Sequence, residues 1–192
     1  QDGIALGLAL NGRTLGIVGH GNIGRKVAAF GRALGMQVLA WSPNLTTERA
    51  REAGATMVGK NELIASSDVL SIHVPLTEQS QNLIDAVDLA LLRDGAILIN
   101  TSRGPIVNEV ALIAALRRGR ITAALDVFDE EPLPIDHPFR SLPNAVLTPH
   151  LGFSTDTCMT DFYGECVDNI VAFLDGRPIR VLNPEALTAQ PQ

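Results

Sequence analysis

The sequence has 192 residues, of which 46% are hydrophobic and 4% aromatic, and its formal net charge is −6 at pH 7. A chain of this length can bury about 70% of the surface that its unfolded form exposes, so it needs neither a disulfide nor a metal to fold. The acidic balance argues against nucleic-acid binding, which needs a basic surface, and no run approaches the roughly 20 apolar residues of a membrane span. We therefore expect a globular α/β domain with no nucleic-acid or membrane partner.

The two cysteines, Cys158 and Cys166, have no cysteine or histidine partner at metal-ligand spacing. We expect them to be buried as small hydrophobic side chains in a cytoplasmic protein, without a metal site.

Short aliphatic runs alternate with longer amphipathic segments, which predicts a doubly wound parallel sheet of the Rossmann type with right-handed crossovers. Near-continuous aliphatic runs are typical of parallel strands that are buried on both faces. The expected strands are residues 14–19, 37–41, 56–58, 69–74, 96–100, 122–127 and 145–147.

Three of the intervening segments have apolar residues at helical spacing. Each is followed by a glycine that can end the helix in the left-handed conformation: Gly35, Gly119 and Gly176. Asn108 is the expected N-cap of the second helix and Ser154 opens the third. The expected apolar stripes are Ile23, Val27, Phe30 and Leu34 in the first helix; Val110, Ile113 and Leu116 in the second; and Met159, Phe162, Cys166, Ile170 and Phe173 in the third.

The stretch 128–149 breaks this rhythm with five prolines and several carboxylates. A loop of this length is uncommon inside a compact domain and is usually functional.

The sequence GHGNIG at residues 19–24 directly follows the first expected strand and opens the first helix. In this pattern Gly19 makes the tight turn, Gly21 admits a pyrophosphate close to the backbone, and Gly24 allows close packing of helix on strand. The helix N-terminus at Asn22 and Ile23 offers free amides and a positive dipole end. The strand before it and the helix after it are the context that predicts a dinucleotide site.

At the end of the second strand, an acidic residue usually binds the adenine ribose hydroxyls. Ser42 occupies this position, and no carboxylate is present to repel a 2′-phosphate. No arginine follows at Pro43 or Asn44 to hold such a phosphate. The cofactor is therefore NAD or NADP, with NAD favoured.

Four further motifs follow in order, and together they resemble the D-specific 2-hydroxyacid dehydrogenase family over nearly the whole chain. They are SIHVPLT at 71–77, NTSRGPIV at 100–107, LDVFDEEP at 125–132 and LTPHLG at 147–152.

The resemblance implies a catalytic set. Arg103 matches the arginine that holds the carboxylate and carbonyl oxygen of the 2-oxo acid, a task that suits its planar, permanently charged fork. His150 matches the general acid that protonates the carbonyl oxygen as hydride arrives. Glu131 matches the carboxylate paired with that histidine, and a carboxylate favours the charged imidazole. Glu130 is the neighbouring alternative, but the family pattern places the carboxylate directly before proline.

The resemblance also implies further cofactor contacts, on both the adenine side and the nicotinamide side. The family commonly has an apolar residue at position 20, where this chain has His20, whose side chain we expect to point away from the phosphates. The implied contacts are Val74 and Pro75 on the adenine side, Thr101, Ser102 and Asp126 on the nicotinamide side, and Gly152.

The implied function is interconversion of a 2-oxo acid and a D-2-hydroxy acid by hydride transfer. A formate-type dehydrogenase is a less favoured alternative, because that subgroup has Gln where this chain has Glu131. A dinucleotide-sensing corepressor or scaffold on the same fold is the alternative from another class, since such proteins can keep the same residues.

The family architecture implies that residues 1–12 end a connecting helix, that 13–176 form the dinucleotide-binding domain, and that 177–192 return towards a substrate domain whose main part is absent. We expect such a fragment to bind dinucleotide and to turn over poorly, because the missing domain closes the cleft. The resemblance further implies a homodimer, and leaves the identity of the 2-oxo acid open.

Overall fold

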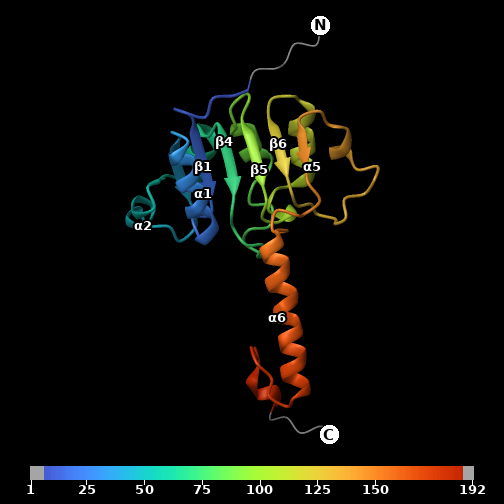
Figure 1. Ribbon diagram of the computed structural model, residues 1–192. Coiled ribbons are helices and arrows are strands. Elements are labelled where there is room, and N and C mark those ends of the chain that lie inside the picture. Colours follow the sequence, from blue (N-terminus) through green and yellow to red (C-terminus); the bar gives the residue numbers. More distant parts are fainter. Residues whose placement is uncertain (1–6, 188–192) are drawn as a thin grey trace. The chain divides into compact units, whose positions relative to one another are not determined.

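The computed structural model describes residues 7–187, in which the chain forms a parallel sheet flanked by helices (Figure 1). All seven strands pair in parallel, in the order β3-β2-β1-β4-β5-β6-β7. The expected doubly wound Rossmann-type fold is therefore confirmed. The strands are β1 (Thr14–Val18), β2 (Gln37–Trp41), β3 (Thr56–Met57), β4 (Val69–Ile72), β5 (Ile97–Asn100), β6 (Thr122–Leu125) and β7 (Ala145–Leu147).

The strand order reverses between β1 and β4, which lie side by side at the centre of the sheet. In open parallel sheets, ligands bind beyond the carboxyl ends of the strands at such a switch point. Here the segments that leave β1 and β4 touch. Gly19 has φ +95°, and a Cβ on it would lie 2.6 Å from the carbonyl carbon and oxygen of His73. Only glycine allows this approach.

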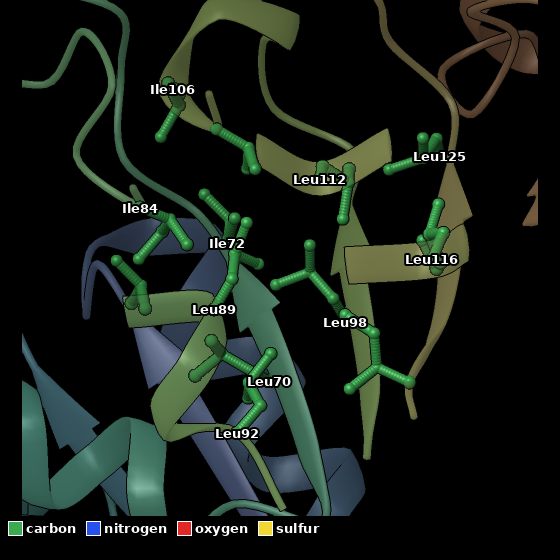
Figure 2. Packing of buried hydrophobic residues seen from close by; sticks show 14 of the residues in the cluster. Leu70, Ile72, Ile84, Leu89, Leu92, Leu98, Ile106, Leu112, Leu116 and Leu125 are labelled. Atoms are coloured by element: carbon green, nitrogen blue, oxygen red, sulfur yellow. The ribbon is translucent and has the colours of Figure 1, made fainter. Parts of the chain in front are cut away.

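The larger part of the core packs around β4, β5 and β6, where branched aliphatic side chains interdigitate (Figure 2). Leu70, Ile72 and Leu98 project from neighbouring strands and are completely buried. Each such side chain stabilises the fold by roughly 1.5–3 kcal/mol. Helices α4 (Ala86–Leu91) and α5 (Glu109–Arg117) cover this region with Leu89 and Leu112.

Helix α1 (Asn22–Ala33) packs on the sheet through small residues, not through the predicted apolar stripe. Its buried residues are Gly24, Ala28 and Gly31. A Cβ on Gly24 would lie 2.0 Å from the carbonyl oxygen of Gly19, and one on Gly31 would lie 2.5 Å from a Leu15 methyl group. Backbone contact this close leaves no room for larger side chains. The predicted stripe is therefore wrong as a packing face: Val27 is partly buried, and Ile23, Phe30 and Leu34 are 66%, 68% and 55% exposed.

Helix α5 begins as predicted, because the Asn108 side chain accepts a hydrogen bond from the amide of Ala111. Its expected inner face is confirmed in part: Leu116 is buried and Ile113 packs against the core, partly buried. Leu112 is also buried, whereas Val110 is exposed. The other helices of this unit are short: α2 (Thr47–Glu52), α3 (Lys60–Ser66) and two 3₁₀ turns, η1 (Gly104–Ile106) and η2 (Pro138–Ser141).

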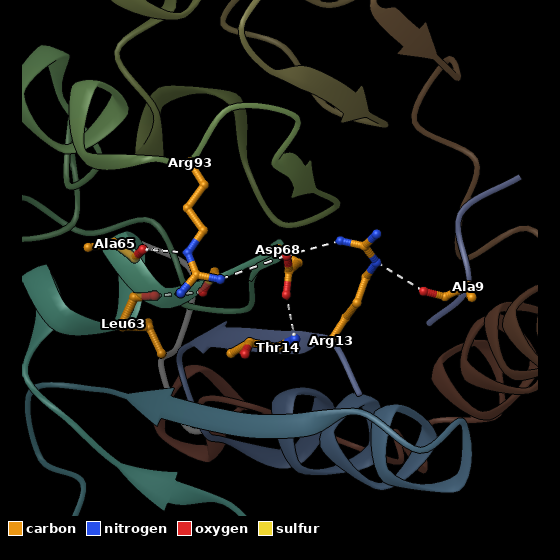
Figure 3. A network of polar contacts seen from close by, with 8 residues as sticks. Ala9, Arg13, Thr14, Leu63, Ala65, Asp68 and Arg93 are labelled. Atoms are coloured by element: carbon orange, nitrogen blue, oxygen red, sulfur yellow. Dashed lines mark hydrogen bonds and ion pairs between the residues drawn. The ribbon is translucent and has the colours of Figure 1, made fainter. Parts of the chain in front are cut away.

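Asp68 forms hydrogen bonds at the amino-terminal edge of the sheet, the edge opposite the carboxyl ends of the strands (Figure 3). Its carboxylate accepts hydrogen bonds from the Thr14 amide at 2.8 Å and from the Arg13 guanidinium at 3.2 Å. Arg93 lies 3.8 Å away and donates to the Ala65 carbonyl. Hydrogen bonds to a charged partner are the stronger kind, so Asp68 joins the starts of β1 and β4.

The chain divides into two compact units, residues 1–152 and 153–192. In the second, Thr155 caps helix α6 (Asp156–Leu174), one residue after the predicted Ser154. No residue of α6 is buried; Cys166 is exposed and Cys158 is partly buried, so the expectation of buried cysteines is wrong. The turn η3 (Pro184–Leu187) follows. Residues 1–6 of the expected connecting helix lie outside the described residues, and 7–12 are not helical.

Between residues 7 and 187, no helix combines the length and the apolar character that a bilayer crossing requires.

Candidate active site

The segment between β1 and α1 forms a turn whose backbone faces outward. Gly21 is the N-cap of α1, no side chain caps the helix, and its first turn holds no acidic residue. A Cβ added to Gly21 would meet nothing within 4 Å, so the space beside this backbone is open. The amides of Asn22 and Ile23 and the positive end of the helix dipole are therefore available to an anion. These features fit the pyrophosphate of a dinucleotide.

The residues expected on the adenine and nicotinamide sides lie at the carboxyl ends of neighbouring strands. Ser42 follows β2 and is partly buried, while Val74 is buried after β4 and Pro75 is exposed. The Ser102 hydroxyl donates to the Val74 carbonyl at 2.5 Å, which joins the segment after β5 to the segment after β4. Thr101 is exposed beside it.

Arg103 sits in a short loop that a buried side chain organises. The Asn100 carboxamide, 1% exposed, accepts from the Ser102 amide at 3.0 Å and donates to the Arg103 carbonyl at 2.9 Å. The first of these bonds is an Asx turn. The Arg103 guanidinium is exposed and donates to the Ser102 carbonyl at 2.6 Å. Asn100 was not among the predicted site residues, although an Asn at a strand end two residues before a turn is the sequence signal for it.

Glu131 and His150 are in direct contact. His150 Nδ1 donates a hydrogen bond to Glu131 Oε2 across 2.6 Å, and the side chains are 37% and 33% exposed. The other carboxylate oxygen of Glu131 accepts from the Phe128 amide at 2.9 Å. Because both oxygens accept hydrogen bonds, the carboxylate keeps one orientation, with Oε2 toward the imidazole.

The pKa of Glu131 is lowered by its surroundings. Partial burial acts to raise it, but the hydrogen bonds from His150 and the Phe128 amide, and the positive charges of His150 and Arg103, lower it further than burial raises it. Glu131 is therefore ionised at neutral pH and stabilises a protonated imidazole beside it. The contribution of Arg103 shows that its charge acts on the same group.

Asp126 anchors the turn that carries His150. One oxygen of its buried carboxylate accepts from the Thr148 hydroxyl at 2.5 Å and from the Leu151 amide at 3.0 Å; the other accepts from the Gly152 amide at 2.9 Å. A Cβ on Gly152 would lie 3.0 Å from that second oxygen. Burial acts to raise the pKa of Asp126, but these three bonds and the charge of His150 lower it overall. Thr148 was missed because a threonine before proline has no distinctive sequence signal.

The backbone of His150 is in the left-handed region, with φ 51°, and its amide donates to the Thr148 carbonyl at 3.1 Å. A non-glycine residue in this conformation needs support from its neighbours. The Asp126 bonds on both sides of His150 supply that support and set the direction of the ring.

The structure thus places Arg103, Glu131 and His150 after three adjacent strands, β5, β6 and β7. A cavity of about 510 Å³ borders the Glu131–His150 pair, with Leu133 and Arg140 on its wall, and Arg103 does not line it. The arrangement offers a proton donor held by a carboxylate, and a guanidinium close by. These are the groups needed to bind and protonate an anionic carbonyl compound.

Comparison with known proteins gives one consistent family. Residues 2–152 match the family model described as D-isomer specific 2-hydroxyacid dehydrogenase, NAD binding domain. The chain is 43% identical over 184 residues to a glyoxylate reductase of Aeropyrum pernix, covering 95% of this chain and 55% of that protein. It is 39% identical over 176 residues to a D-3-phosphoglycerate dehydrogenase of Archaeoglobus fulgidus, covering 91% and 33%.

A solved structure of D-lactate dehydrogenase from Aquifex aeolicus, complexed with NAD and lactic acid, superposes with a TM-score of 0.80 at 34% identity, covering 92% of this chain and 58% of that one. The chain thus spans about half the length, or less, of the proteins it matches.

Proposed function

Because the chain belongs to the D-isomer specific 2-hydroxyacid dehydrogenase family, we propose that its protein reduces a 2-oxo acid to a D-2-hydroxy acid with NAD(P)H, and catalyses the reverse oxidation. The observation that carries the proposal is the 2.6 Å hydrogen bond between His150 and Glu131. It lies at the strand ends of a dinucleotide-binding fold, where ligands bind.

The residues that would hold the cofactor are those of the β1–α1 turn, with Gly21 and the first amides of α1 at the pyrophosphate. When bound, the reduced nicotinamide supplies a hydride to the carbonyl carbon. Val74 and Ser102, whose segments are joined by their hydrogen bond, would also contact the cofactor.

Arg103 binds the substrate. A 2-oxo acid presents a carboxylate and an adjacent carbonyl oxygen, and a guanidinium can donate to both at once. Arg103 also polarises the carbonyl, because its positive charge stabilises the negative charge that develops on the oxygen during reduction. The Asn100 bonds fix the loop from which it reaches.

His150 supplies the proton. Its Nδ1 hydrogen is engaged by Glu131, so Nε2 is the atom that exchanges a proton with the substrate oxygen. In reduction, the protonated ring donates from Nε2 to the oxygen as the hydride reaches the carbon, which yields the hydroxyl group and neutral imidazole. In oxidation, the neutral ring accepts the hydroxyl proton, and the ionised Glu131 stabilises the resulting charge.

The test is a kinetic panel with the full-length protein. Glyoxylate, hydroxypyruvate, pyruvate and branched 2-oxo acids are each supplied with NADH and with NADPH, and oxidation of the cofactor is followed by absorbance. We expect turnover with at least one acid. If no acid supports turnover, the proposal fails. Dinucleotide binding that changes the assembly state without turnover would favour a sensing function instead.

A further inference from the structure

A second cavity, of about 530 Å³, is lined by residues of α1 and α2, which are labelled in Figure 1. Its wall includes the cationic side chains Arg25 and Lys26 of α1 and Arg49 of α2, together with His20. Glu52 is its only carboxylate among the described residues. The chain as a whole carries a formal charge of −6, so this cavity is a local concentration of positive charge on an acidic protein.

The two arginines are held in place without being neutralised. Arg25 donates to the Asn22 side chain at 2.9 Å, and Arg49 donates to the Asn44 carbonyl at 3.4 Å. Within residues 7–187, no carboxylate lies within ion-pair distance of Arg25, Lys26 or Arg49. Both bonds are to neutral oxygens, so the positive charges stay available to an anion. Two guanidinium groups on separate helices suit a phosphate, which accepts several such bonds.

His20 is a second and independent sign of a ligand. It is 4% exposed, and neither ring nitrogen has a hydrogen-bond partner among the described residues. Buried polar atoms are rarely left unsatisfied in proteins. Burial, followed by the charges of Arg25 and Arg49, lowers the pKa of His20, so the ring is neutral at pH 7. A neutral imidazole can donate one N–H to a phosphate oxygen. The sequence led us to expect that the His20 side chain points away from the phosphates; its buried nitrogens lie instead at the wall of this cationic cavity.

The position of the cavity indicates which phosphate group of a dinucleotide it would bind. The Arg49 bond to Asn44 places this guanidinium on the loop that follows Ser42, where the adenine ribose of a dinucleotide is expected. No carboxylate stands at Ser42 to bind the ribose hydroxyls or to repel a phosphate there. The absence of arginine at Pro43 and Asn44 favoured NAD from the sequence; the fold supplies two arginines from other segments.

We propose that this cationic cavity, formed by His20, Arg25, Lys26 and Arg49, binds the 2′-phosphate of NADP(H). The inference rests on the proposed function, because it requires the dinucleotide to bind at the β1–α1 turn. The protein then uses NADPH in preference to NADH.

The test is a binding measurement that needs no substrate. Trp41, the only tryptophan in the sequence, ends β2 directly before Ser42 and is an intrinsic fluorescence reporter. The 192-residue chain is titrated with 5′-AMP, adenosine 2′,5′-bisphosphate, NADH and NADPH, with calorimetry as the second readout. We expect the 2′-phosphorylated member of each pair to bind at least about tenfold more tightly, as two charge-assisted contacts would give.

Substitutions of the cavity residues test whether the preference for NADPH over NADH comes from this cavity. Arg25→Gln and Arg49→Gln should each weaken NADPH binding by about fivefold or more and leave NADH binding within twofold, since each removes one charge-assisted contact to the phosphate. Glu52→Gln should strengthen NADPH binding, because it removes the opposing charge. Arg51→Gln is the matched control, an exposed arginine of the same helix α2 that does not line the cavity.

The outcomes separate the two proposals. Equal binding of phosphorylated and unphosphorylated ligands would overturn the 2′-phosphate site and leave the dinucleotide site intact. Failure of all four ligands to bind would overturn both. Inorganic phosphate is titrated alone as a further arm; if it binds as tightly as adenosine 2′,5′-bisphosphate, the cavity is a free-anion site and the inference is wrong.

Discussion

His150 Nδ1 donates its hydrogen to Glu131 Oε2 across 2.6 Å, and this contact determines which ring nitrogen faces the chemistry. With Nδ1 committed to the carboxylate, only Nε2 can exchange a proton with a substrate oxygen. The second carboxylate oxygen is held by the Phe128 amide, so the pair cannot rotate freely. A proton donor oriented in this way is typical of general acid–base catalysis.

Replacing Glu131 by Gln should keep a hydrogen-bond acceptor and remove its charge. We expect a lower kcat for reduction, because the protonated ring loses its counter-charge in the transition state. KM for the 2-oxo acid should change little. The measurement is kcat and KM for reduction at pH 7 in the full-length protein.

Glu130→Gln is the matched control for this experiment. Glu130 is adjacent and exposed, and the carboxylate that contacts His150 Nδ1 is that of Glu131. An unchanged kcat in Glu131→Gln, or the same loss in Glu130→Gln, would contradict the assignment.

Arg103→Lys should act on substrate binding. Lysine keeps the positive charge and loses the planar fork that can donate to two oxygens. We expect KM for the 2-oxo acid to rise by about tenfold or more, with the dissociation constant of the dinucleotide unchanged. Arg117→Lys, at the end of α5, is the control. A KM equal to that of the wild type would exclude Arg103 from substrate recognition.

The strands could be predicted because each follows a short aliphatic run, and β2 and β7 begin and end where their runs do. The packing face of α1 could not be predicted in the same way. A hydrophobic stripe selects large side chains such as Ile23 and Phe30, whereas close backbone contact with the sheet selects Gly24 and Gly31. The residues that α1 buries do recur at helical spacing in the sequence. Because they are small, a search for large apolar side chains overlooks them.

The residues of the candidate site also divide into those that sequence motifs predict and those that only the folded structure reveals. Arg103, Glu131 and His150 belong to motifs that can be read along the chain. The partners Asn100 and Thr148 act through hydrogen bonds that exist only after folding. Likewise, Arg25 and Arg49 lie far apart in sequence and share one cavity only because α1 and α2 flank the end of β2. Local motifs identify groups that perform chemistry, and tertiary structure identifies those that position them.

Asp126→Asn should destabilise the turn that carries His150. The variant loses the charge that accepts three hydrogen bonds, which we expect to lower the free energy of unfolding by about 1.5–3 kcal/mol at pH 7. Because the folded-state pKa of Asp126 is lowered from the ordinary 3.8, its contribution is complete above that value and is lost as pH falls through the lowered pKa. Urea unfolding at pH 7 and pH 3 measures both effects. The variant should lose less stability than the wild type over this interval, and an equal loss would contradict the assignment.

His73 should produce a separate loss of stability as pH falls, in a pH range above the one in which Asp126 titrates. Burial lowers its pKa from 6.5 to about 4, and Ser71 Oγ lies 2.8 Å from its Nε2. The unfolded chain takes up this proton near pH 6.5 and the folded chain does so only near pH 4, so falling pH favours the unfolded state between these values. His73→Gln should remove this slope from thermal melts recorded between pH 7 and 4.5. A slope equal to that of the wild type would show that another group titrates there.

The most direct test of the central claim is kcat/KM for reduction by the full-length protein and its His150→Gln variant, with the best 2-oxo acid of the panel and saturating cofactor. Glutamine keeps a polar side chain that cannot deliver the proton, so we predict a fall of about 10²- to 10⁴-fold, with dinucleotide affinity unchanged. A variant that retained wild-type kcat/KM would contradict the assignment of His150 as the proton donor.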